Sequence, residues 1–577
     1  MPLLILLVAP AASAQTTTIQ SEGPLGGSAS GAAMLPAISA DGRYVVFQSF
    51  ASELVPGDQN GCEDIFRRDV WTGELVLVSV GLAGSTGDGP SRQSQISGDG
   101  RYVLFQSFAS DLVQGDTNGE TDIFVRDVLL GVTQRISVSS SGVQSDGGSR
   151  YGYISRDGQL AAFESHASNL VPNDSNGTKD VFMHDLASGA TWIESLAFDG
   201  SPANDHVLCS SISPDGRYLG FSSDATNLVP GDTNGAMDAF VRDTWTDVNL
   251  RVSTDVAGHE GHGLSADVNV AAGGRFVAFY SDAADLVPGD TNALGDVFVK
   301  DTWTGAIERV SVSSGGAQGN WDAYYPRISA DGRCVVFWSS ADTLVTPDTN
   351  WQPDVFLHDR QSGTTERVSL TAAGHEARGW TRFSALSEDG RFVAFESLAP
   401  NLDPPDLNNT WDVFVRDRVG WYQRFCSGDG SAGAACPCAN PGGSGRGCAN
   451  GLDPAGAQLS ASGVPAADDV VLVGSGLSGM LALFLQGDLE LGTPAVFGRG
   501  LRCIGGNLLR LYSAPVSGLA ASAPAPGQPS LRARSAELGD TLPPGATRAY
   551  QVWYRDAVPG GCGSAPTNVS NALRIHW

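Results

Sequence analysis

Short runs in which apolar and polar residues alternate recur along the first 425 residues, separated by turn-forming residues. The runs "DIFVRD" at 122–127 and "IERVSV" at 307–312 show this alternation, which is typical of β-strands with one buried face. A segment ending in Ile-Ser leads into Asp-Gly-Arg, a two-residue hairpin signal, and a second strand such as "YVVFQS" at 44–49 follows. The pattern therefore predicts groups of four short antiparallel strands.

These groups repeat with a strict period of 58 residues. The hairpin signal stands in "ADGRYVVF" at 40–47, "GDGRYVLF" at 98–105, "RDGQLAAF" at 156–163, "PDGRYLGF" at 214–221, "GGRFVAF" at 273–279, "DGRCVVF" at 331–337 and "DGRFVAF" at 389–395. Seven units covering residues 20–425 predict an all-β fold, a seven-bladed β-propeller. The N-terminal "TTTIQS" is expected to complete the last blade, because that blade's own end, "WYQRFC", is short. A solenoid of stacked sheets is the alternative, but it would need capping repeats that the sequence does not show.

The units resemble the TolB-like, WD-repeat-like β-propellers of bacteria through two motifs, "S-x-DGR-Y/F-V-x-F-x-S" and "D-V/I-F-V-R-D-x-x-T-G". The resemblance implies the propeller fold and leaves function open, because this fold carries many functions. It also implies that an acidic, Asn-bearing turn can occur in such blades without metal.

Loop lengths distinguish the two ends of the predicted propeller. The turns joining strands one–two and three–four are tight, whereas the other two connections are long, as in "FASELVPGDQNGCE" at 50–63 and "SSGGAQGNWDAYYP" at 313–326. Binding residues usually lie on loops held by a rigid scaffold, so the long-loop end is the expected ligand face. The Arg of Asp-Gly-Arg lies at the opposite, plain end, where we expect a solvated or inter-blade ion pair.

A second motif at the long-loop end, Asp-x-Asn with another Asp six residues after the first, keeps the same period. Carboxylate and amide oxygens are ligands that calcium prefers, so the motif indicates Ca²⁺. A structural turn is the alternative, because Asp and Asn bond their own backbone in Asx-turns, and both interpretations remain open. The Gly that follows Asn in four copies is replaced by Ala293, Trp351 and Asn409, and weaker binding is expected there. The candidate calcium ligands are Asp58, Asn60, Asp64, Asp116, Asn118, Asp122, Asp174, Asn176, Asp180, Asp232, Asn234, Asp238, Asp290, Asn292, Asp296, Asp348, Asn350, Asp354, Asp406, Asn408 and Asp412.

The connection from the fourth strand to the next unit is the least repeated segment, which indicates contact with a ligand rather than a requirement of the scaffold. Packing between blades is the alternative. The candidate ligand-face residues are Arg92, Tyr151, His206, His262, Trp321, Tyr324, Tyr325, Trp380 and Arg382. The sequence contains no zincin helix, nucleophile elbow or Walker-type loop, so we predict a non-enzymatic binding or scaffold protein. A secreted hydrolase acting on carbohydrate or peptide is the alternative, because acidic pairs are plentiful.

Net charge narrows the partners. The chain has 63 acidic and 35 basic residues, a formal net charge of −28. Such a surface repels phosphate backbones, so we expect no nucleic-acid partner. A protein or carbohydrate ligand of unspecified identity, and cations, remain as partners.

The first residues, "MPLLILLVAPAASAQ", predict a secretory signal peptide over 1–14, with an apolar core and the small residues Ala12-Ser13-Ala14 before the cleavage site. No later stretch is long and apolar enough to predict a membrane span. We therefore expect a secreted, periplasmic or cell-envelope protein, with the propeller over 15–425.

The repeat ends at Cys426, and strand-like runs such as "DVVLVGSGL" and "RAYQVWYRD" predict a small β-sandwich over 426–577. This segment contains Cys426, Cys436, Cys438, Cys448, Cys503 and Cys562. An even number of cysteines in an exported chain predicts three disulfides of open pairing, which leaves Cys62, Cys209 and Cys334 as free thiols. Zinc bound by Cys436, Cys438 and Cys448 is the alternative. The mark "CPC-x-NPG…G-x-GC-x-N" resembles a C-terminal module of secreted bacterial propeller proteins and implies no particular activity.

Overall fold

The structure is a computed structural model that describes residues 15–23, 29–172, 174, 176–402, 408–418, 422–425, 436, 446–450, 452, 456–462, 465, 468, 470–497, 500–543, 546–555 and 567–577. The predicted signal peptide, Asp406, Cys426, Cys438 and Cys562 lie outside these residues. The chain divides into two compact units, one of residues 16–418 and one made mainly of residues 419–577. No helix in the described part is both long and apolar enough to cross a membrane.

The first unit consists, in its described part, of seven antiparallel sheets of four strands each. The first strands are β2 (Ala33–Ile38), β6 (Ser91–Ile96), β10 (Ser149–Ile154), β14 (Val207–Ile212), β18 (Ser265–Val270), β22 (Ala323–Ile328) and β26 (Thr381–Leu386). The second strands are β3 (Tyr44–Ser49), β7 (Tyr102–Ser107), β11 (Leu160–Ser165), β15 (Tyr218–Ser223), β19 (Phe276–Ser281), β23 (Cys334–Ser339) and β27 (Phe392–Ser397). The third strands are β4 (Asp64–Asp69), β8 (Asp122–Asp127), β12 (Asp180–Asp185), β16 (Asp238–Asp243), β20 (Asp296–Asp301), β24 (Asp354–Asp359) and β28 (Asp412–Asp417). The fourth strands are β5 (Leu75–Leu77), β9 (Val132–Arg135), β13 (Thr191–Ile193), β17 (Val248–Arg251), β21 (Ile307–Arg309), β25 (Thr364–Arg367) and, in the seventh sheet, β1 (Thr16–Ile19).

The seven sheets close into a ring, as the period predicts. Each first strand lies beside the first strands of both neighbouring sheets, so these strands line the centre of the ring. Backbone N–H groups in the strand one–two hairpins donate to carbonyl oxygens of the equivalent hairpin in the next blade. The bonds run from Ala40 to Gly98, Gly98 to Arg156, Arg156 to Pro214, Ala272 to Ala330, Ala330 to Glu388 and Glu388 back to Ala40. The step from Pro214 has no donor, because proline lacks an N–H.

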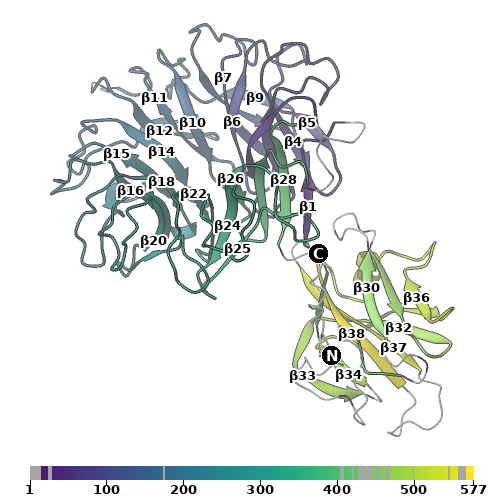
Figure 1. Ribbon diagram of the computed structural model, residues 1–577. Helices are drawn as coiled ribbons and strands as arrows, with labels where there is room; N and C mark the ends of the chain where they lie inside the picture. The colour runs from purple at the N-terminus through teal and green to yellow at the C-terminus, as the bar shows by residue number, and fades with distance from the viewer. Residues whose placement is uncertain are drawn as a thin grey trace. The chain divides into compact units, whose positions relative to one another are not determined.

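The N-terminal strand completes the seventh blade. In β1, Thr16 pairs with Asp417 and Ile19 with Phe414, and Figure 1 shows purple β1 beside green β28. The segment expected to end this blade does not do so. Its strand β29 (Tyr422–Phe425) pairs with β38 (Thr567–His576) of the second unit, because β1 already occupies the edge of β28.

The plain end of the propeller is held by ion pairs within each blade. In the fourth blade, Arg217 Nη2 lies 2.6 Å from Asp243 Oδ2, which joins the strand one–two turn to the end of strand three. Five other blades repeat the pair, and the third blade has Gln159 in place of the arginine. The five pairs are Arg43–Asp69, Arg101–Asp127, Arg275–Asp301, Arg333–Asp359 and Arg391–Asp417. The expected ion pair is present and partly exposed to solvent, but it lies within one blade rather than between blades, because the two tight turns of one blade lie side by side.

The hydrophobic core of the propeller lies between adjacent sheets. Val46 and Ile65 of the first sheet pack with Val103 and Phe124 of the second in one buried cluster. The alternation in strands two and three places these side chains on the buried faces. The core therefore fixes the blades, and the long loops stand at one end of a rigid scaffold.

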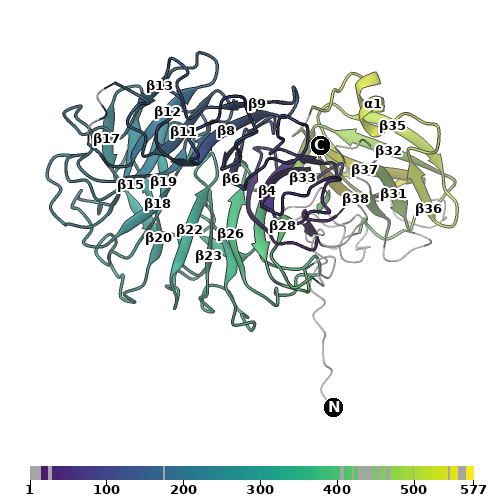
Figure 2. The same cartoon turned by 90° about the horizontal axis from the view of Figure 1, so that it is seen from above.

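The second unit is a β-sandwich (Figure 2). One sheet contains β29, β38, β37 (Thr547–Arg555), β32 (Leu481–Gly487) and β35 (Leu509–Pro515), and the other contains β30 (Gln458–Ser462), β31 (Val471–Ser475) and β36 (Ala520–Ala523). The hairpin of β33 (Leu489–Phe497) and β34 (Gly500–Gly505) and the helix α1 (Leu531–Glu537) complete the described elements. Leu459 and Leu472 of the smaller sheet share a core with Phe484 and Tyr550 of the larger one.

The cysteines follow the disulfide prediction where they are described. Cys436 and Cys448 form a disulfide with a Cα–Cα distance of 5.8 Å, and Cys503 is also disulfide-bonded. The zinc alternative is wrong for Cys436 and Cys448, because their sulfurs are joined to each other. The first unit contains the free thiols Cys62, Cys209 and Cys334.

Candidate functional site

The asparagine of the repeated loop motif is a structural bridge. In the first blade, Asn60 Nδ2 donates to Asp64 Oδ2 at 2.8 Å and to the Gly87 carbonyl oxygen at 2.9 Å. Its Oδ1 accepts the backbone N–H of Cys62, which forms an Asx-turn. All seven asparagines make the turn and the bond to the next loop, and all but Asn292 also bond the motif's last Asp. The amide is thus used within the protein, as the structural-turn interpretation predicts.

The last aspartate of the motif is buried in every blade. Asp64 accepts the Ser79 hydroxyl at 2.6 Å, and the same Ser–Asp bond recurs in each sheet. None of these seven carboxylates is more than 1% exposed. Burying an ionised carboxylate that has only neutral partners costs free energy. Whether it stays ionised therefore depends on a positive charge beside it.

In four blades an arginine of the fourth strand supplies that charge. Arg251 Nη1 lies 2.9 Å from Asp238 Oδ2 and 2.6 Å from Glu260 Oε2. The first aspartate, Asp232, is 3.5 Å away through Oδ1. The ligand oxygens of these three acidic residues lie within 4.8 Å of one another, an arrangement that could hold a metal ion, but the guanidinium already contacts all three. Arg135, Arg309 and Arg367 bind the equivalent aspartates in the second, fifth and sixth blades.

The first and third blades have Leu77 and Ile193 at the position of this arginine. Asp58 Oδ1 and Asp180 Oδ2 are buried there without a hydrogen-bond partner in the described residues. Burial raises the pKa of Asp64 to about 6. The seventh blade has Ile19 at this position, and its first aspartate lies outside the described residues.

The bend after the asparagine does not depend on glycine. Ala293, Trp351 and Asn409 adopt φ values of 56°, 58° and 57°, close to the 66° of Gly61. A side chain in this left-handed region is uncommon and strained, most of all for a bulky residue. Trp351 is 81% exposed in this conformation, which indicates that its position serves something other than packing.

The first strands carry a β-bulge, and in four cases a side chain of the preceding blade accepts a hydrogen bond from the backbone N–H of the bulge. Gln93 and Tyr151 have φ values of 55° and 49°, and their N–H groups donate to the Gln48 and Gln106 side chains at 3.1 Å. Glu164 and Glu396 accept from the bulges of two further blades. In these four blades the fifth residue of the second strand is a Gln or Glu that locks adjacent blades together, whereas the fourth blade has Ser222 there.

Two blades replace this locking residue with an aromatic one. Tyr280 stands at this position in the fifth blade and Trp338 in the sixth. Tyr324 stacks between them, with ring centroids 5.4 Å from Tyr280 and 4.8 Å from Trp338. The bulge residue Tyr325 packs edge-on against Phe383, with centroids 4.8 Å apart. These stacks join β19, β22, β23 and β26 of three successive blades.

Three exposed tryptophans stand on the loops beside these stacks. Trp321, Trp351 and Trp380 are 56%, 81% and 51% exposed. The Thr381 N–H donates to the Pro353 carbonyl oxygen at 3.0 Å, which brings the segments of Trp380 and Trp351 together. We call the set Tyr280, Trp321, Tyr324, Tyr325, Trp338, Trp351, Trp380 and Phe383 the aromatic sector.

The predicted basic ligand-face residues have partners of their own. Arg92 Nε lies 2.7 Å from Glu63 Oε2, and Arg382 Nε lies 2.9 Å from Glu396 Oε1. The Arg382 guanidinium also stacks over the rings of Phe383 and Trp411, at 4.9 and 4.3 Å from their centroids.

The other predicted ligand-face residues are spread over several blades. Tyr151 is 43% exposed on β10. His206 Nδ1 accepts the backbone N–H of Lys179 at 3.5 Å. His262 bonds Asp285, and this hydrogen bond raises the pKa of the imidazole. The structure thus brings Trp321, Tyr324, Tyr325, Trp380 and Arg382 together and leaves the two histidines outside the sector.

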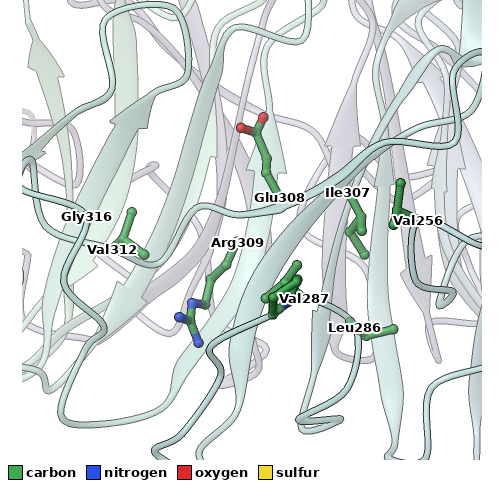
Figure 3. A pocket seen from close by; sticks show the side chains of 9 residues that line it. Val256, Leu286, Val287, Ile307, Glu308, Arg309, Val312 and Gly316 are labelled. Atoms are coloured by element: carbon green, nitrogen blue, oxygen red, sulfur yellow. The ribbon is translucent and has the colours of Figure 1, made fainter.

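A cavity of about 420 Å³ lies elsewhere, beside the outer strand β21 of the fifth blade (Figure 3). Val256, Leu286, Val287 and Ile307 line one side of it. Arg309 is engaged with Asp290 and Asp296. The lining offers apolar contact but no converging acid–base pair.

Sequence reasoning missed Tyr280, Trp338, Phe383 and the arginines of the fourth strands. The residue type at each of these positions changes from unit to unit, which is the signal that could have found them. Tyr280 and Trp338 stand where four other units have Gln or Glu and the fourth unit has Ser222, and Arg251 stands where the first unit has Leu77.

No model of a protein family matches the chain, and no curated protein does. Solved structures similar to it include an oligogalacturonate lyase from Vibrio parahaemolyticus, with a TM-score of 0.42 and 11% identity over 71% of this chain and 92% of that chain. An oligogalacturonate lyase in complex with manganese gives a TM-score of 0.43 and 10% identity, over 71% and 94%. TolB from Acinetobacter baumannii gives a TM-score of 0.32 and 16% identity, over 57% of this chain and 77% of that chain. At these TM-scores and identities the likenesses carry no argument about activity or ligand.

Proposed function

We propose that the chain is an exported, non-enzymatic binding protein whose ligand contacts the aromatic sector at the long-loop end of blades five to seven. The observation that carries the proposal is the replacement of the locking Gln or Glu by Tyr280 and Trp338. Four other blades make this junction with a hydrogen bond to the Gln or Glu side chain, and the fourth blade has the small Ser222 there, so the aromatic residues answer a different requirement. Large aromatic rings with one polar edge are typical of binding surfaces.

The ligand we propose is a neutral carbohydrate. Exposed indole rings offer flat apolar surfaces that match the C–H faces of sugar rings. The two arginines that sequence analysis placed on this face are each paired with a glutamate, so they offer little attraction to an acidic polymer. The net charge of −28 also disfavours binding of an acidic polymer. A protein ligand is the other partner class that the sequence leaves open.

Export and calcium complete the proposed function. The disulfide Cys436–Cys448 fits an oxidising compartment, which supports a secreted or cell-envelope location. We propose calcium as a stabilising ion only in blades whose motif loop lacks the fourth-strand arginine, because only there do the carboxylates lack a positive neighbour.

Affinity electrophoresis tests the binding function. The purified chain is run in gels containing neutral polysaccharides (a β-glucan, a galactomannan and a xylan) and in gels containing polygalacturonate. We expect retardation by at least one neutral polymer, and at least a tenfold weaker retardation for the double variant Trp321→Ala/Trp380→Ala.

The matched control is Trp245→Ala/Trp303→Ala. These tryptophans are 72% and 71% exposed and stack on Arg217 and Arg275 at the plain end. Equal loss for both double variants, or retardation by none of the polymers, would contradict the proposal. Release of new reducing ends without unsaturated products in the same samples would favour the hydrolase alternative.

A further inference from the structure

The arginines of four blades show which atoms of the motif loop bind a cation. Each guanidinium reaches both aspartates of its motif, through contacts of 2.8–3.5 Å. In three of these blades Nη2 also donates to the carbonyl oxygen just before the first aspartate, in Gly115, Gly231 and Pro347. A fourth partner comes from the following loop, where Glu260 and Glu376 contact Arg251 and Arg367. We call the space between these oxygen atoms the slot. In these four blades the guanidinium fills the slot with positive charge.

The first blade keeps these oxygens and loses the charge. Gly57, Asp58, Asp64 and Thr86 stand at the four oxygen-bearing positions, and Leu77 stands at the arginine position. Asp58 is 8% exposed, Asp64 is fully buried and Thr86 is 9% exposed.

The free atom in this slot is the one that binds the guanidinium elsewhere. Asp58 Oδ1 is buried without a hydrogen-bond partner in the described residues. Asp290 Oδ1 also has no hydrogen bond in the described residues, but it lies 3.1 Å from Arg309 Nη1, and Asp116 Oδ1 lies 3.2 Å from Arg135 Nη1. What the first blade lacks is therefore the positive charge. Leu77 offers no donor and no charge, so the residue at the arginine position does not neutralise this buried oxygen.

We propose that a calcium ion occupies this slot of the first blade, bound by the carboxylates of Asp58 and Asp64 with the Gly57 carbonyl and the Thr86 hydroxyl. The inference rests on the calcium part of the proposed function and gives it a location. Carboxylate, carbonyl and hydroxyl oxygens suit a hard divalent cation, and water completes the coordination of calcium. Two positive charges offset the two buried carboxylates, as the guanidinium does in the sister blades.

Of the two arginine-free slots in which both aspartates are described, that of the third blade is the poorer. Asp174 and Asp180 are present, and Asp180 Oδ2 is buried without a hydrogen-bond partner in the described residues. However, Pro202 replaces the residue equivalent to Thr86, which removes one oxygen side chain. Calcium is therefore expected to bind first in the first blade.

The experiment counts calcium ions on the full mature chain by equilibrium dialysis, after chelation and at millimolar free calcium. Thermal unfolding is followed in EDTA and in calcium alongside. Leu77→Arg converts the slot to the form of the sister blades, and Asp58→Asn removes one ligand charge at constant shape. Val76→Arg is the matched control, because it adds the same charge on the opposite face of β5.

The wild type is expected to bind calcium saturably and to melt at a higher temperature with it. Leu77→Arg and Asp58→Asn should each bind one calcium fewer per chain, and Val76→Arg should bind as the wild type does. Leu77→Arg should also melt in EDTA nearer to the calcium-loaded wild type. A wild type without saturable binding, or an unchanged count in both slot variants, would overturn the inference.

If Leu77→Arg does not fold, Asp58→Asn alone decides the question. The polysaccharide test uses Trp321 and Trp380 and does not depend on this slot. A negative result in the calcium experiment would therefore not contradict carbohydrate binding, and a negative result in the polysaccharide experiment would not contradict the calcium site.

Discussion

The backbone N–H of Glu388 donates to the carbonyl oxygen of Ala40 across 3.1 Å, and this bond joins the seventh blade to the first. β1 makes the second closure, since Thr16–Ile19 pairs with β28 through four residues. Both closures tie the beginning of the described chain to the seventh blade.

Deletion of residues 15–20 from the mature chain should open the ring. Ile19 is 6% exposed, and loss of its burial and of the strand pairing should lower the melting temperature by roughly 5 °C or more. Differential scanning calorimetry measures the shift, with a chain that starts at Gln15 as the control. An unchanged midpoint would mean that the N-terminal strand does not hold the ring.

Arg251→Leu should give the fourth blade the arrangement that Leu77 gives the first blade, in which the motif aspartates have no guanidinium beside them. Three acidic residues would lose their shared cation, and breaking a mostly buried ion pair costs about 3–5 kcal/mol. Millimolar calcium should restore most of the lost stability, because Asp232, Asp238 and Glu260 have ligand atoms within 4.8 Å of one another. Thermal unfolding with EDTA and with calcium measures this. Destabilisation that calcium does not relieve would show that these carboxylates cannot replace a guanidinium by an ion.

Acid should weaken the plain end through its Arg–Asp pairs. The hydrogen bond from Arg217 lowers the pKa of Asp243 to about 2, and Arg333 has the same effect on Asp359. The unfolded carboxyl titrates near 3.9, so these pairs stabilise the folded chain above about pH 4 and lose that contribution as pH falls toward about 2.

Asp243→Asn should therefore narrow the difference between the melting temperatures measured at neutral pH and near pH 2.5. Asp185→Asn in the third blade is the control, because Gln159 gives that aspartate no arginine partner. An equal narrowing in both variants would contradict the role of the arginine.

The disulfide of the second unit should stabilise that unit and not the propeller. Cys436 and Cys448 are 12 residues apart, and closing a loop of this size contributes about 3 kcal/mol. The double variant Cys436→Ser/Cys448→Ser should lower only the melting transition of the C-terminal unit. Mass spectrometry of the unreduced chain should find Cys436 and Cys448 joined, with Cys62, Cys209 and Cys334 open to alkylation after unfolding. Alkylation of Cys436 without a reductant would contradict the pairing.

The sequence predicts the propeller because each 58-residue unit carries the same strand signals, and even the role of Thr16–Ile19 follows from the count of strands. It does not predict the partner of Arg217, since two turns 26 residues apart meet only once the four strands are paired. The choice between a turn and a metal loop could not be made from Asp58 and Asn60 alone. It depends on a fourth-strand residue, Leu77 or its arginine equivalents, that reaches the loop across the sheet.

The aromatic sector was predicted in part for a similar reason. Trp321 and Trp380 lie on long loops, where variation is visible along the chain. Tyr280 and Trp338 lie within regular strands and look like ordinary β-strand residues. Their meaning depends on the bulge of the next blade, which the alternation of apolar and polar residues does not reveal.

Hydrogen–deuterium exchange with the most strongly retarding polysaccharide tests the central claim, that the aromatic sector is the ligand face, most directly. The account predicts protection of segments 320–328, 350–354 and 378–386, and no change in the plain-end hairpins such as 40–44 and 98–102. Protection confined to those hairpins or to the second unit, with the aromatic sector unchanged, would contradict it.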